Sequence, residues 1–87
     1  MESEEIQDLL LRKMHRIGAW GTHHISESNL QKSFPAHLRG KVIDEAEKLR
    51  KQGLLVKHPS SHDRQWWLNW NRKPEIDARV KKFDEKQ

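Results

Sequence analysis

Apolar residues recur along the chain with two different periods, and the change from one to the other predicts an α+β fold. Between residues 3 and 17 they stand three or four positions apart, which predicts an amphipathic helix with Ser3 as its N-cap. Gly18 is a natural residue to end this helix. The expected apolar stripe consists of Ile6, Leu9, Leu10, Met14 and Ile17.

The middle of the chain predicts a short strand and two further helices. Residues 22–25 are too short and too closely flanked by glycine for a helix, so we expect a short strand or an extended linker there. Ser26 can cap a brief helix that runs to about Phe34, where Pro35 ends it. A third helix is expected over residues 37–52, ending at Gly53. Its predicted buried stripe is Leu38, Val42, Ala46 and Leu49, with Ile43 at the edge.

After Gly53 the apolar period falls to two, which predicts a hairpin of strands 54–58 and 65–70 around a polar loop. Alternation assigns Trp66, Leu68 and Trp70 to the inner face of the hairpin. Trp67 then points outward, where it indicates a partner surface unless the last helix covers it. That helix is expected to begin at Pro74, with Ile76, Val80 and Phe83 at helical spacing.

The predicted order is helix, short strand, helix, helix, two-stranded hairpin and C-terminal helix. Residues 42–56, with a periodic helix that ends in Leu-x-x-x-Gly-Leu before a strand, resemble the junction of the third helix and wing in winged helix-turn-helix proteins. Residues 59–69, with Asp63 and Arg64 near the tip and Leu68 and Asn69 in the return strand, resemble wings of the multiple-antibiotic-resistance-regulator type. Residues 34–40, 68–69 and 74–76 also resemble small archaeal winged-helix proteins of uncharacterised role.

Charge is unevenly distributed in this chain of 87 residues, whose formal net charge is +4. Residues 32–73 carry ten Lys and Arg against four Asp and Glu. We expect one winged-helix domain over residues 1–87, with residues 1–3 and 84–87 frayed. The resemblance implies binding of double-stranded DNA and transcription regulation, with the third helix in the major groove. The expected nucleic-acid-binding residues are His37, Arg39, Gly40, Lys41, Asp44, Lys48, Lys51, Lys57, His62 and Arg64.

These residues have different expected roles. Arg39 and Lys41 suit phosphates or guanine edges, whereas Lys48 and Lys51 suit phosphates only or are simply solvated. Gly40 would let the backbone of the duplex approach closely. In the wing, Arg64, with His62 and Lys57, would reach the minor groove or its phosphates. An alternative is that Arg64 pairs only with Asp63.

Other functional classes are disfavoured by the composition. The chain has no cysteine, and the adjacent His23 and His24 would point to opposite faces of a strand, so no metal site or other cofactor is expected. No paired-carboxylate site, phosphate loop or nucleophile with a nearby base is present, so we do not expect an enzyme. The acidic start and the absence of a long apolar run predict a cytoplasmic protein without a membrane span.

Two alternatives remain open at the level of sequence. Asp44 and Glu47 on the presumed groove face, together with an outward Trp67, favour a protein-protein interaction module. Recognition of RNA by shape, as in ribosome-associated winged helices, is the other. The first and last helices also offer apolar stripes for a homodimer, unless the core uses them fully.

Overall fold

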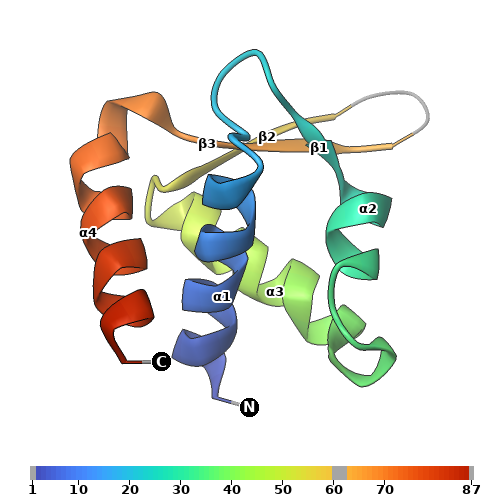
Figure 1. Cartoon of the computed structure of the whole chain (residues 1–87). Coiled ribbons are helices and arrows are strands. Elements are labelled where there is room, and N and C mark those ends of the chain that lie inside the picture. The colour runs from blue at the N-terminus through green and yellow to red at the C-terminus, as the bar shows by residue number, and fades with distance from the viewer. Residues whose placement is uncertain (1, 60–62, 87) are drawn as a thin grey trace.

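The computed structural model describes residues 2–59 and 63–86, which form an α+β fold (Figure 1). Within these ranges four α-helices accompany one three-stranded antiparallel sheet. The helices are α1 (Ser3–Arg16), α2 (Glu27–Lys32), α3 (Arg39–Lys51) and α4 (Lys73–Glu85). The strands are β1 (Ile25–Ser26), β2 (Leu55–His58) and β3 (Gln65–Leu68), and short 3-10 turns, η1 (Ala36–Leu38) and η2 (Trp70–Arg72), precede α3 and α4. No helix in these ranges is long and apolar enough to cross a membrane.

The capping prediction is confirmed for α2 and wrong for α1. The Ser26 side chain accepts a hydrogen bond from the Asn29 backbone N–H at 3.2 Å, which satisfies one free donor of the first turn. Ser3, by contrast, lies inside α1, and the capping residue is Glu2, without a side-chain cap. The Ser3 hydroxyl instead donates to Glu45 of α3, so a tertiary partner replaces the expected local bond.

One continuous core joins the helices to the inner face of the sheet. α1 packs against α3 on one side and α4 on the other, so it lies between them (Figure 1). The buried stripe of α3 is as predicted, with Leu38, Val42, Ala46 and Leu49 at or below 5% exposure. In α1 the stripe is shifted, because Leu11 is buried whereas Ile17 is 46% exposed. The apolar stripe of α1 is therefore buried in the core of the monomer.

The sheet has the order β1-β3-β2, so β3 is the central strand. The expected hairpin is present, and its register pairs Lys57 with Trp66 and Val56 with Trp67. The first strand is displaced from the predicted residues 22–25: in the segment that follows α1, Ile25 and Ser26 form the strand paired with β3, and Trp20 makes an isolated bridge to Leu68. The hairpin is held against the chain that follows α1, since the Leu68 N–H donates to the Ala19 carbonyl at 2.7 Å.

Trp70 does not belong to the core, in contrast to the alternation-based prediction. Trp66 and Leu68 are fully buried, but β3 ends at Leu68 and Trp70 is 61% exposed. The reason lies in Asn69, whose side chain caps the η2 turn by accepting from the Asn71 N–H at 3.1 Å. A helical turn replaces the extended backbone there, so the period-two pattern no longer applies.

Candidate functional site

The outward face of α3 and its preceding turn carries most of the residues expected at the nucleic-acid interface. Gly40, Asp44 and Lys51 lie on one side of the helix, and all three are exposed. His37 in η1, and Arg39, Lys41 and Lys48 in α3, are also exposed. The backbone at Gly40 is helical, and a Cβ there would meet no described atom within 4 Å. The start of α3 is therefore open to a partner.

Two carboxylates of α3 form ion pairs within the protein with some of the cations expected at the interface. Glu45 is only 6% exposed and accepts hydrogen bonds from Ser3, from Gln7 at 2.9 Å and from Lys48 at 3.0 Å. Burial raises the pKa of Glu45, but the three hydrogen bonds and the charge of Lys48 outweigh it, so the pKa lies below its ordinary value. Lys48 is consequently tied to the α1–α3 contact.

Glu47 likewise forms an ion pair with Lys57, whose side chain extends from β2 to α3. The hydrogen bond from Lys57, followed by that from Arg50 at 2.9 Å, lowers the pKa of Glu47 despite its desolvation. The Lys57 ammonium also lies 5.4 Å from the centre of the Trp66 ring. Because Lys57 shares the inner-face register of Trp66, it is engaged inside the fold and does not project from the wing.

A smaller set of cations on α3 is available to an external partner. Within residues 2–59 and 63–86, Lys41 and Lys51 have no hydrogen-bond or ion-pair partner. Arg39 donates from Nε to the Phe34 carbonyl at 3.3 Å, which leaves its charge without a carboxylate. Asp44 is likewise exposed and unpaired in this part of the chain. The face therefore presents three uncompensated cations and one uncompensated carboxylate.

The base of the β2–β3 hairpin, which is the predicted wing, is bound to the first turn of α2 through Glu27. The Glu27 N–H donates to the Arg64 carbonyl at 2.8 Å, and its Oε1 accepts from the Trp66 indole N–H at 3.0 Å. Glu27 Oε2 also lies 3.4 Å from Arg64 Nη1, and the Arg64 side chain is still 57% exposed. Arg64 thus has a carboxylate partner on α2 and remains accessible to solvent.

Asp63 adds a second link between the wing and α2. A hydrogen bond from the Ser28 hydroxyl at 2.6 Å, with further bonds from backbone N–H groups, lowers the pKa of Asp63 and outweighs its desolvation. The carboxylate lies at the N-terminus of a helix, where negative charge is favoured. His62, expected beside it at the wing tip, falls outside the described residues.

Trp67 lies on the outer face of the sheet, as alternation predicted, and is half-buried. Its ring is stacked on His24 at a centroid distance of 4.2 Å, with His58 at 6.3 Å. The cover comes from these two histidines on the neighbouring segments, and Ile76 and Phe83 of α4 belong to other contacts. The most exposed tryptophan of the chain is therefore Trp70 rather than Trp67.

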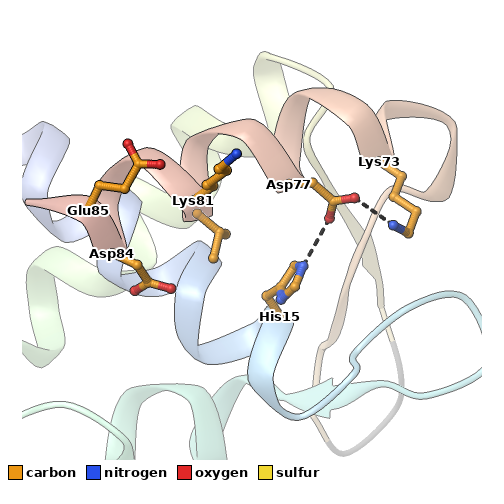
Figure 2. Close-up of a pocket in the computed structure, with 7 residues that line it drawn as sticks. His15, Lys73, Asp77, Lys81, Asp84 and Glu85 are labelled. Atoms are coloured by element: carbon orange, nitrogen blue, oxygen red, sulfur yellow. Dashed lines mark hydrogen bonds and ion pairs between the residues drawn. The ribbon is translucent and has the colours of Figure 1, made fainter.

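A groove of about 590 Å³ lies between the end of α1 and the outer side of α4. Figure 2 shows His15 pointing to Asp77, which also receives Lys73 from one turn earlier. The two distances are 2.9 Å from His15 Nε2 and 2.5 Å from Lys73 Nζ. The hydrogen bond from Lys73, and then that from His15, lowers the pKa of Asp77.

The groove has an aromatic end and an acidic end. The Lys73 ammonium lies 5.8 Å from the ring centres of both Trp20 and Trp70, which meet edge to face at 5.5 Å. Asp84 and Glu85 lie at the opposite end (Figure 2).

No cluster of three or more metal-ligating side chains occurs in the described ranges. Comparisons of the chain with protein-family models, curated proteins and solved structures gave no match.

Sequence reasoning assigned no role to Glu27, placed Glu47 on the presumed groove face and placed Trp70 in the core. The two glutamates act through partners 37 and 10 positions away, so neither has a local signature. Trp70 does have a local signature, since an asparagine followed by a helical segment and Pro74 is typical of a helix start. That signal, if preferred to strand alternation, would have ended the strand before Trp70.

Proposed function

We propose that this chain is a winged-helix protein that binds double-stranded DNA through the outward face of α3 and the base of its wing. The order of helix, strand, helix, helix, hairpin and helix supports the winged-helix assignment. The observation that carries the binding proposal is the surface at the start of α3, where Gly40 is open beside the unpaired Lys41. A helix inserted in the major groove contacts base edges mainly through such early residues.

The charges favour phosphate contacts over extensive base reading. Arg39, Lys41 and Lys51 are free to neutralise phosphates, and Arg64 could add a fourth contact if it leaves Glu27. Lys48 and Lys57 already have carboxylate partners, so they contribute less than the sequence suggested. Asp44 opposes phosphates and would accept only from a cytosine amino group.

The test is fluorescence anisotropy of a short labelled duplex of random sequence with the full chain and its Lys41→Glu variant. We expect Lys41→Glu to weaken binding about tenfold at low salt and to lower the salt slope by about 1. Lys82→Glu on α4 is the matched control, because it makes the same charge change at an exposed residue without a partner in the described chain. Equal losses for both variants would show a nonspecific charge effect and overturn the proposal.

Two arms of the same experiment separate the alternatives. A duplex-RNA competitor that displaces the DNA at equal concentration would favour recognition of RNA by shape. No binding to either duplex at low salt would favour a protein-interaction module, for which the exposed Trp70 is the first residue to substitute.

A further inference from the structure

The outer side of α4 carries a ridge of four charged residues at intervals of four. They alternate in sign along the helix as Lys73, Asp77, Lys81 and Glu85, and all four line the groove beside α1 (Figure 2). Residues four apart lie above one another on a helix, so the ridge is continuous and about 18 Å long.

Only the first two residues of this ridge have ion-pair partners within the described part of the chain. Lys73 and Asp77 bind each other, and Asp77 also receives His15. Lys81 and Glu85 are exposed, and neither has an ion-pair partner in residues 2–59 and 63–86. Two opposite charges are therefore available on the same face.

The ridge is complementary to itself when one copy is reversed. An alternating series of four charges, read backwards, has the opposite sign at each place. We propose that α4 pairs antiparallel with α4 of a second copy of this chain, related by a two-fold axis near residue 79. Lys81 then faces the partner's Asp77, and Glu85 faces the partner's Lys73. Ridges of residues four apart are the ones that commonly interdigitate when helices pack, and such a pairing is isologous.

Apolar surface next to the ridge would be covered in the same contact. Trp70 adjoins the Lys73 end of the groove and supplies this surface, whereas Val80, between the charged residues, is only 7% exposed and belongs to the core. Trp70 is 61% exposed, which makes it a favourable anchor for an interface. The self-complementary order of charges favours a second copy of the chain over an unrelated peptide, because binding of an unrelated peptide would not require this order.

The proposed α4–α4 interface is small and rich in charge. We therefore expect a dimer that dissociates at micromolar concentrations and whose affinity falls as salt is raised. It leaves the proposed DNA-binding face uncovered, because α1 lies between α3 and α4 (Figure 1). The dimer therefore stands independently of the proposed function. If both hold, each dimer presents two α3 helices.

Sedimentation velocity of the full chain between about 1 and about 500 μM at low salt tests the proposal. Wild type should dimerise reversibly, and Lys81→Glu and Glu85→Lys should each raise the dissociation constant about tenfold or more. Neither substitution removes a contact of the monomer within the described ranges. Lys82→Glu is again the matched control and should dimerise like wild type. A wild type that stays monomeric throughout, or equal weakening by Lys82→Glu, would overturn the proposal.

Zero-length carbodiimide cross-linking tests the orientation. An amide between Lys73 and Glu85 cannot form within one α4, because these residues lie about 18 Å apart along the helix. We expect this cross-link in the dimer fraction of wild type and its loss in Lys81→Glu, whose two reacting residues are intact. A dimer without the Lys73–Glu85 link would contradict the antiparallel pairing.

Discussion

Gly40 occupies the second position of α3, where its helical backbone gives no reason for glycine and a Cβ would meet no described atom within 4 Å. Gly40→Ala should raise the free energy of unfolding by about 0.5–1 kcal/mol, since alanine is the better helix former. If a DNA backbone approaches here, the same methyl group should weaken duplex binding about fivefold, equivalent to about 1 kcal/mol. Chemical denaturation and anisotropy measure the two effects, and unchanged affinity in a stabilised variant would exclude close approach at this residue.

Glu45 links α3 to α1 and makes folding sensitive to acid. Its pKa is lowered in the folded state, so its stabilising contribution is complete above the unfolded-state pKa and is lost as the pH falls through the folded-state pKa. Glu45→Gln should cost about 1–2 kcal/mol at pH 7, because the charge-assisted bond to Lys48 is removed. The difference from wild type should shrink between about pH 5 and about pH 3. Urea unfolding across this range provides the measurement, and a constant difference would contradict the assignment.

At the scale of elements, the junction of α2 and the wing sets how available Arg64 is. Glu27→Gln keeps an oxygen to accept from Trp66 but removes the charge that holds Arg64. We expect a loss of about 1 kcal/mol or less in stability, because Arg64 is 57% exposed, although the Glu27 side chain is only 16% exposed. Duplex affinity should rise about fivefold at low salt, as a cation is released and an anion removed.

Glu75→Gln is the control for this junction, since Glu75 forms an exposed ion pair with Arg72 at the start of α4, away from α2 and the wing. It makes the same charge change and should leave duplex affinity nearly unchanged. A decrease in affinity for Glu27→Gln would mean that Arg64 binds DNA while it is paired with Glu27, which holds its side chain in position.

The elements also show where local signals were sufficient. Ser26 and Gly53 began and ended helices as predicted, because each acts on backbone groups within four residues. Ser3 has equally good capping chemistry, yet it binds Glu45 from α3. Trp70 was assigned to the core by strand alternation, and the cap formed by Asn69 removed it from the strand. For Ser3 the local rule competed with a tertiary partner that the pattern does not reveal, whereas for Trp70 it competed with a second local signal.

At the scale of the whole molecule, the number of available cations predicts the salt dependence of DNA binding. Contacts from Arg39, Lys41, Lys51 and Arg64 would give a slope of about −3.6 in a plot of log affinity against log salt. Raising salt from about 50 to about 200 mM should then weaken binding about 150-fold, and about 40-fold in Lys41→Glu. Anisotropy titrations at four or more salt concentrations give the slope. A slope near about −5.4 would mean that Lys48 and Lys57 leave their carboxylates to join the interface.

The sequence by itself determined the α+β class, the approximate extents of the helices, the hairpin, the buried stripe of α3 and the basic middle of the chain. These follow from periodicity, capping and charge order, which act over a few residues. Only the tertiary structure decided which charges remain free. Glu27 pairs with Arg64 and Glu47 with Lys57, at 37 and 10 positions in sequence, so these pairs depend on which elements pack together. The Glu45–Lys48 pair lies within α3, and Glu45 is bound there by Ser3 and Gln7 of α1. The same packing left Lys81 and Glu85 of the α4 ridge exposed and unpaired in the described chain.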